Sequence, residues 1–138
     1  MSIDYKTLIR AAITARKSAY APYSGFMVGA ALLTKAEKIY PGCNIENAAY
    51  TPSLCAERTA FSAAVAAGER EFAAIAVAGW AKNGKPGYAF PCGVCRQVMM
   101  EFCDSGDFVI ITAAGEEDYS AKRLGELLPD GFGPADLQ

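Results

Sequence analysis

Hydrophobic residues near the start of the chain recur at the spacing of one helix face and then give way to an unbroken apolar run. The first pattern, with Asp4 in the N-cap position, predicts a helix that continues to about Tyr20. The run 26–34 is apolar at successive positions, which indicates an inner strand covered on both faces. A polar turn at 35–38 leads into a second strand, expected at 39–43.

The middle of the chain alternates between helical and strand patterns. We expect a helix at about 54–67, which Gly68 ends from the C′ position. A strand of the buried type is expected at 72–80, and a polar loop containing glycine and proline separates it from a helix at about 92–102. Another short apolar strand is expected at 108–112.

Patterns in the C-terminal part are weaker. Residues 116–119 are expected to enter a fifth strand or a loop, and Ser120 is expected to cap a last short helix that ends at 128–129. The tail, 130–138, is expected to be irregular. The order α-β-β-α-β-α-β-β-α predicts an α/β fold with a mixed five-stranded sheet and helices on both faces. The 138 residues, 1–138, are expected to form a single domain.

Composition excludes several classes of function. The net charge is −2 and the basic residues are scattered, so no phosphate-binding face and no nucleic-acid partner are expected. No signal segment and no apolar run of membrane-spanning length are present, so no membrane partner is expected. The odd count of five cysteines favours the reducing cytoplasm over an extracellular disulfide framework. Because the chain has no histidine, histidine-based triads and histidine-ligated metal sites are excluded.

Two short motifs carry the candidate chemistry. The first is Cys55-Ala56-Glu57, and the second is Pro91-Cys92-Gly93-Val94-Cys95. Three thiolates can hold zinc and leave a fourth position open for water, and the pattern is typical of zinc-dependent nucleoside and nucleobase deaminases. Both motifs are placed at predicted helix N-termini, where the helix dipole favours thiolates. The alternatives are buried apolar thiols or a structural zinc site, for which Cys43 or Cys103 would have to be the fourth ligand.

Neighbouring polar residues have an interpretation in the same site. Glu57 can stand beside the bound water without ligating the metal, although a first-turn glutamate can also simply complement the helix dipole. Arg58, and less clearly Gln97, can donate hydrogen bonds to the ligand sulfurs and offset their negative charge. Asn44 and Glu46 follow a strand and point the same way in extended chain, which suits ribose hydroxyls; the simpler interpretation is a polar turn.

Nearly the whole chain resembles the small homotetrameric, zinc-dependent cytidine deaminases. The resemblance implies a three-layer α-β-α fold with one Zn²⁺ per subunit. It also implies hydrolysis of cytidine and 2′-deoxycytidine to uridine and 2′-deoxyuridine with release of ammonia, in cytoplasmic pyrimidine salvage. The stretches that carry it are 21–24, 26, 28–32, 42–48, 55–59, 91–93, 95–98 and 127–129.

The resemblance also implies roles for individual residues. Cys55, Cys92 and Cys95 would bind zinc, and Glu57 would shuttle protons. Substrate contacts would come from the remaining matched positions: Asn44 and Glu46 at the ribose, with Phe26 and Ala56 beside the base. Arg58 and Gln97 would hydrogen-bond the ligand thiolates, and Phe132 would reach the site of a neighbouring subunit.

Two residues depart from the family pattern beside the expected metal site. Phe90 stands where a small residue such as serine or threonine usually precedes Pro-Cys, and Val94 replaces the commoner alanine. Both changes alter the expected shape of the leaving-group side of the pocket. A related deaminase with altered N4 or base selectivity is therefore an alternative. A non-catalytic, zinc-stabilised module is another, and an enzyme that edits polynucleotides lacks the basic groove it would need.

Overall fold

The computed structural model describes residues 2–138, which form one mixed sheet with helices on both faces. The element order confirms the sequence of helices and strands expected from the hydrophobic pattern. In chain order the elements are α1 (Tyr5–Arg16), β1 (Phe26–Thr34), β2 (Ile39–Cys43), α2 (Ala56–Ala66), β3 (Phe72–Ala81), α3 (Gly93–Phe102), β4 (Val109–Gly115), β5 (Asp118–Arg123), α4 (Leu124–Leu127) and a 3₁₀ helix, η1 (Pro134–Leu137).

The five strands lie in the order β2-β1-β3-β4-β5. Only β3 and β4 run parallel, and α3 forms the crossover between them; the other neighbours are antiparallel. The prediction that 26–34 is an inner strand is confirmed, because β1 pairs with β2 on one side and with β3 on the other. Its successive apolar residues serve both faces: Ala30 and Leu32 belong to one core, and Ala31 and Leu33 to the other.

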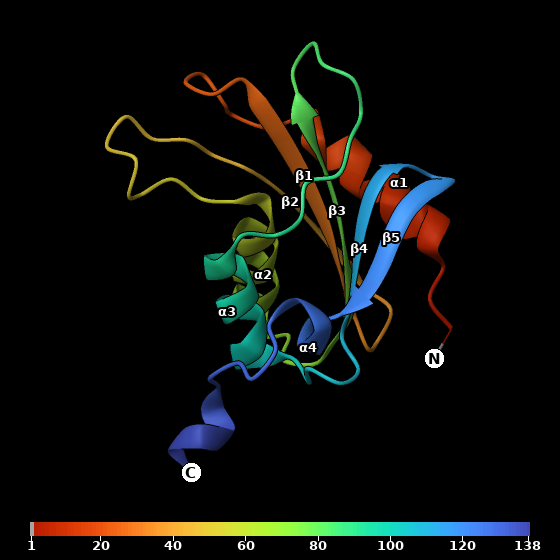
Figure 1. Ribbon diagram of the computed structural model, residues 1–138, viewed down its shortest axis with the longest axis vertical. Helices are drawn as coiled ribbons and strands as arrows, with labels where there is room; N and C mark the ends of the chain where they lie inside the picture. The colour runs from red at the N-terminus through yellow and green to blue at the C-terminus, as the bar shows by residue number, and fades with distance from the viewer. Residues whose placement is uncertain (1) are drawn as a thin grey trace.

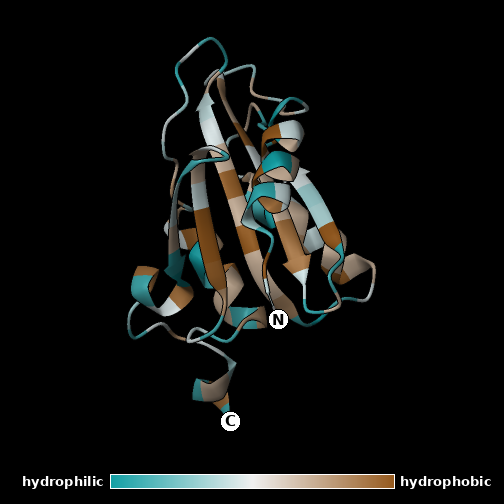
Figure 2. Cartoon of the chain, turned by 90° about the vertical axis from the view of Figure 1, so that its right-hand side faces the viewer, coloured by the Kyte–Doolittle hydropathy of each residue, from teal (hydrophilic) through white to brown (hydrophobic). Residues whose placement is uncertain are grey.

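Three layers result from these two cores. Helix α1 covers one face of the sheet through Leu8, Ile9 and Ala12, and α2 and α3 cover the other face, where Phe61 and Met99 are buried. Figure 1 shows α1 on one side of the strands and α2 and α3 side by side on the other. Figure 2, seen from the α1 side, shows that hydrophobic residues concentrate along the strands between these helices.

Two glycines allow the helices to approach the sheet closely. A Cβ on Gly29 would lie 2.0 Å from the Ala12 carbonyl oxygen of α1, and one on Gly42 would lie 2.5 Å from the Ala60 nitrogen of α2. Both distances are far below van der Waals contact, so these positions accept no side chain without movement of backbone. Gly42 therefore sets the distance between β2 and the helix that carries Cys55.

The boundaries predicted near Tyr20 and at Ser120 differ from the structure. Helix α1 ends at Arg16 and not near Tyr20, because the Tyr20 amide donates to the Asn44 carbonyl and the chain has already turned toward the sheet. Ser120 does not cap a helix: it pairs with Thr112 inside β5, and the last helix begins only at Leu124. Strand pairing with β4 overrides the local capping preference.

The tail is also more regular than predicted. Pro134 lies in the first turn of the 3₁₀ helix η1, and the Asp136 side chain accepts a hydrogen bond from the Gly133 amide. This short element projects from the end of the molecule below α3 and α4 (Figure 1).

Candidate functional site

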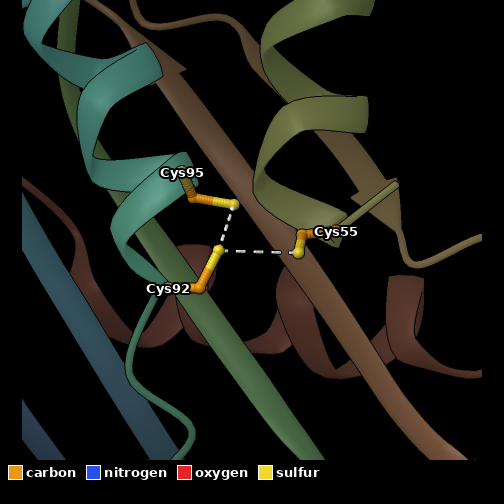
Figure 3. Close-up of side chains that lie close together, drawn as sticks. All are labelled: Cys55, Cys92 and Cys95. Atoms are coloured by element: carbon orange, nitrogen blue, oxygen red, sulfur yellow. Dashed lines mark hydrogen bonds between the residues drawn. The ribbon is translucent and has the colours of Figure 1, made fainter. Parts of the chain in front are cut away.

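The N-terminal ends of α2 and α3 bring the three predicted zinc ligands together. Cys55 is the N-cap of α2 and Cys92 the N-cap of α3, while Cys95 lies one turn into α3. Neither N-cap sulfur accepts a capping hydrogen bond from a backbone amide of its own helix, so both are free to face the cluster. Figure 3 shows the three side chains converging, with Sγ–Sγ distances of 3.9 Å between Cys55 and Cys92 and 3.6 Å between Cys92 and Cys95.

This sulfur spacing fits zinc. A tetrahedral Zn²⁺ with bonds of about 2.3 Å to sulfur separates its sulfur ligands by about 3.8 Å. All three Sγ atoms lie within 4.8 Å of one another, and in residues 2–138 neither Cys43 nor Cys103 belongs to the group. The geometry is therefore that of a three-cysteine site with one position left for a non-protein ligand, and not of a closed structural site.

The cluster favours a thiolate at Cys55. A hydrogen bond with Cys95, with a further contribution from the Arg58 guanidinium, lowers the pKa of the Cys55 thiol to about 5. The same interaction with Cys55, together with burial, raises the pKa of Cys95. Because a thiolate at Cys55 disfavours a second negative charge at Cys95, a cation bound between these sulfurs would favour the thiolate form of both.

Glu57 is the one carboxylate buried beside the cysteines in the described chain. It is only 4% exposed, yet it lines the same cavity as Cys55 and Cys92. Burial raises the pKa of its carboxyl group to about 7, to which the nearby Cys55 thiolate adds. A carboxyl group in this state exchanges a proton readily near neutral pH, as a proton shuttle must. Ala56, which lies between Cys55 and Glu57 in the chain, is fully buried and lines the same cavity.

Arg58 and Gln97 occupy different positions relative to the sulfurs. The Arg58 Nη2 donates to Cys55 Sγ at 3.4 Å, as expected for a residue that offsets thiolate charge, and its buried Nε has no partner among residues 2–138. Gln97 instead donates from Nε2 to the Phe132 carbonyl oxygen at 2.8 Å. In this structure Gln97 holds the tail against α3, and its expected bond to a ligand sulfur stays a prediction.

A cavity of ≈ 580 Å³ opens in front of the cluster and has two unlike walls. One wall comes from the turn after Pro22 and the segments that follow β2, and it carries polar groups. The other comes from the loop between β3 and α3 and from the first turn of α3, and it is apolar. The first wall consists of Ser24, Phe26, Val28, Asn44, Glu46, Tyr50, Thr51, Ser53 and Leu54, and the second of Ala89, Phe90 and Val94; Arg58 and Val77 line the cavity as well.

Asn44 and Glu46 both line the polar wall but are already held by the protein. The Asn44 side chain accepts from the Val28 amide at 2.9 Å and donates to the Phe26 carbonyl at 2.7 Å, which leaves one amide hydrogen for a ligand. Glu46 accepts from the amide and the hydroxyl of Ser24. The Ser24 hydroxyl is the main cause that lowers the pKa of Glu46. The polar wall is thus preorganised and anionic.

The phenylalanines singled out in the sequence separate into two groups. Phe26 and Phe90 line the cavity from opposite walls, and Phe90 is 43% exposed and not packed in a core. Val94, at 58% exposure, lies on the wall of Phe90. Phe132 is 57% exposed and does not line this cavity.

Sequence reasoning missed two contributors. Tyr50, in a loop before α2 and with a φ of 63°, lines the cavity. Arg96 donates to the Pro91 carbonyl at 2.7 Å and to the Leu127 carbonyl at 2.6 Å, and so holds the corner that presents Cys92. The only signal for Arg96 was its place directly after Cys95; nothing in the pattern marked Tyr50.

Comparisons with known proteins agree with this geometry. Residues 2–112 match the model of the cytidine and deoxycytidylate deaminase zinc-binding region. The chain is 46% identical to the cytidine deaminase of Sporosarcina psychrophila and 44% identical to that of Halalkalibacterium halodurans. Each alignment spans 135 residues and 98% of this chain, with 96% and 98% of the respective relative.

Solved structures show the same likeness. The crystal structure of cytidine deaminase from Burkholderia pseudomallei superposes with a TM-score of 0.85 at 48% identity, covering 94% of this chain and 100% of that one. The enzyme from Mycobacterium tuberculosis gives a TM-score of 0.81 at 37% identity, covering 96% and 99%. The three-layer fold expected from the resemblance is confirmed.

Proposed function

This chain belongs to the cytidine and deoxycytidylate deaminase zinc-binding family, and we infer that it hydrolyses cytidine and 2′-deoxycytidine to uridine and 2′-deoxyuridine with release of ammonia. The observation that carries this inference is one cavity in which three converging thiols meet a buried carboxylate. This combination supplies a metal site and a proton carrier without histidine. The reaction is that of pyrimidine salvage.

Zinc is the cofactor that this family and this donor set bind, through Cys55, Cys92 and Cys95. When bound, zinc lowers the pKa of a coordinated water to about 7 and so makes the nucleophile available at neutral pH. Arg58 offsets part of the negative charge of the three thiolates through its bond to Cys55 Sγ.

Glu57 carries the protons of the reaction. Its carboxylate takes the proton that the attacking water gives up and delivers it to N3 of the cytosine ring, which makes C4 more electrophilic. It then takes the remaining proton from the new hydroxyl at C4 and gives it to the amine that leaves. Burial suits this role, because bulk water cannot replace the carboxylate as proton carrier at a position that is 4% exposed.

The polar wall suits the sugar. Asn44 has one amide hydrogen free and Glu46 is an anionic acceptor, so the pair can bind ribose hydroxyls from a preorganised position. Phe26 and Ala56 border the cavity between this wall and the cysteines, where the base would lie. The free cytosine base, which has no sugar, would lose these contacts.

A homotetramer in the cytoplasm completes the proposal. Phe132 is exposed on a tail that projects from the molecule and is absent from the cavity of its own chain, which supports a role in the cavity of a neighbouring subunit. Three thiols that must stay reduced to bind metal favour a reducing compartment. In residues 2–138, no helix has the length and apolar character needed to cross a bilayer.

Substitution of Glu57 by Gln tests the proposed function. The variant keeps size and hydrogen-bonding capacity, so zinc content and the melting temperature should stay at wild-type values. Turnover of cytidine, followed by ultraviolet absorbance, should fall by the roughly 10²–10⁴-fold that general acid–base catalysis contributes. A variant as fast as the wild type would refute the shuttle. A zinc-loaded wild type inert toward cytidine and deoxycytidine would instead indicate a non-catalytic module.

A further inference from the structure

The apolar wall of the cavity is built around a metal ligand. Phe90 precedes Cys92 by two residues and Val94 follows it by two, and all three line the cavity. Phe90 and Val94 are 43% and 58% exposed, so both side chains are accessible in the single chain. No charged side chain of the described chain lies on this wall between Ala89 and Val94.

The polar groups and the cysteine cluster together indicate how a cytosine nucleoside would lie in the cavity. The sugar is polar and fits the wall of Asn44 and Glu46, and C4 must lie at the cysteine cluster because the attacking water is bound there. In cytosine the amine at C4 and the sugar at N1 are on opposite sides of the ring. The amine on C4 therefore points away from the sugar and lies at the cluster, where Phe90 and Val94 flank Cys92 and line the cavity.

A hydrogen-bonded pair, Tyr88 and Asp118, lies beside Phe90, and we call this pair the strap. The loop between β3 and α3 descends along the sheet to the start of α3 (Figure 1), and Tyr88 in this loop donates its hydroxyl to Asp118 Oδ1 at 2.5 Å. Asp118 is the first residue of β5, on the far edge of the sheet. The Tyr88 and Phe90 rings meet edge to face with centroids 6.2 Å apart. The Phe90 ring thus packs against a tyrosine that is hydrogen-bonded to β5.

We propose that Phe90 and Val94 form the specificity wall for the leaving group, that they admit cytosine nucleosides carrying an alkyl or acyl group on N4, and that Tyr88 and Asp118 are positioning residues for this wall. The proposal rests on the proposed function. An apolar substituent gains contact with Phe90, whereas a small polar residue at this position offers it only hydration or hydrogen bonds.

The reaction on such substrates balances as hydrolysis. Water adds to C4 and the C4–N4 bond breaks; of the two protons that the water supplies, one goes to N3 and the other to the leaving nitrogen. An N4-alkylcytidine yields uridine and a primary amine, and an N4-acylcytidine yields uridine and a carboxamide. No oxidant or reductant takes part, and the proton carrier is the same Glu57 as in the proposed reaction.

The test compares kcat/KM for N4-benzoylcytidine and N4-methylcytidine with that for cytidine in each zinc-loaded variant. Wild type should release uridine from both substituted nucleosides. Phe90→Ser should lower the ratio of substituted to unsubstituted kcat/KM by about tenfold or more, mainly through KM, since the lost contact is to a group present before the chemical step. Phe90→Leu should retain most of the ratio, because it keeps an apolar side chain at this position.

The strap is tested by deleting only its hydrogen bond. Tyr88→Phe and Asp118→Asn should lower the same ratio by about threefold to tenfold and leave zinc content unchanged. The matched control is Tyr40→Phe, because Tyr40 donates to Glu69 at 2.8 Å, also in a tyrosine–carboxylate pair, but does not line the cavity. Tyr40→Phe should leave the ratio at the wild-type value.

The possible outcomes distinguish failure of the specificity wall, of the positioning role and of the proposed function. Turnover of cytidine with no turnover of either N4-substituted nucleoside, or a ratio unchanged in Phe90→Ser and Phe90→Leu alike, would overturn the specificity wall and leave the proposed function intact. Equal effects of Tyr88→Phe and Tyr40→Phe would overturn the positioning role. Absence of turnover of cytidine itself would count against the proposed function. Should Phe90→Ser not fold, turnover of the two N4-substituted nucleosides by the wild type and the ratio in Tyr88→Phe still decide.

Discussion

Gly42→Ala should damage the site although residue 42 belongs to none of its functional groups. The new Cβ would meet backbone atoms of α2, at 2.5 Å from the Ala60 nitrogen and 2.6 Å from the Ala56 carbonyl oxygen. Backbone cannot rotate out of the way as a side chain does, so either α2 or β2 must move. The N-terminus of α2 carries Cys55 and Glu57, and β2 runs directly into the segment with Asn44, so either movement reaches the cavity.

The magnitude follows from the contact distances. Relief of the closest contact to an ordinary separation of 3.4 Å requires a shift of about 0.9 Å. Overpacking of this kind costs about 1–3 kcal/mol of folding free energy. A displacement near 1 Å at a catalytic group costs on the order of 10²-fold in rate, so kcat/KM for cytidine should fall by about that factor in the folded variant.

Gly29→Ala is the matched control on the other face of the sheet. Its Cβ would meet the Ala12 carbonyl at 2.0 Å and the Arg16 nitrogen at 2.2 Å, so α1 must move farther than α2 does in Gly42→Ala. Helix α1 contributes no residue to the cavity. Gly29→Ala should therefore destabilise the fold at least as much, yet keep more of its activity per folded molecule.

Three measurements on each variant decide the matter: the melting temperature by circular dichroism, zinc per chain, and kcat/KM well below the melting temperature. A third variant, Gly84→Ala, has the Ala81 Cβ at 3.0 Å as its nearest neighbour and sets the baseline for a glycine-to-alanine change. The reasoning fails if Gly42→Ala keeps wild-type kcat/KM, or if the activity of all three variants simply follows their stability.

Three further outcomes are expected. Glu46→Ala should cost about 1–3 kcal/mol or more in transition-state binding of cytidine and much less in that of free cytosine. Steady-state kinetics on both substrates measure the two losses, and equal losses would show that the role of Glu46 is structural. Arg58→Ala should weaken zinc binding by about 10–100-fold in a chelator competition, because Cys55 loses its donor, and unchanged affinity would exclude this role. Burial raises the pKa of the Cys103 thiol to about 12, so iodoacetamide at pH 8 should label native Cys103 only after unfolding; rapid labelling of the folded protein, located by mass spectrometry, would contradict this.

The sequence by itself determined the elements and the chemical identity of the site. Strand β1 has the bounds that the apolar pattern predicted, because a two-sided apolar run excludes an exposed helix or loop, and β2 has the bounds expected after the polar turn at 35–38. The three cysteines and Glu57 were identifiable because metal ligation depends on residue type and short spacing, which are local properties. Boundaries failed where a distant partner decided them, as for Ser120, whose place in β5 depends on pairing with Thr112.

Only the tertiary structure decided how these parts act together. Cys55 and Cys92 are far apart in the chain, and packing of α2 beside α3 on the sheet brings their sulfurs to 3.9 Å. The pKa of Glu57 depends on burial, which is a sum over neighbours from several elements and has no signature in a triplet of residues. The Phe90 ring packs against Tyr88, whose hydroxyl is hydrogen-bonded to Asp118 in the edge strand β5. Such long-range contacts form only when the whole chain packs, so sequence spacing cannot encode them locally.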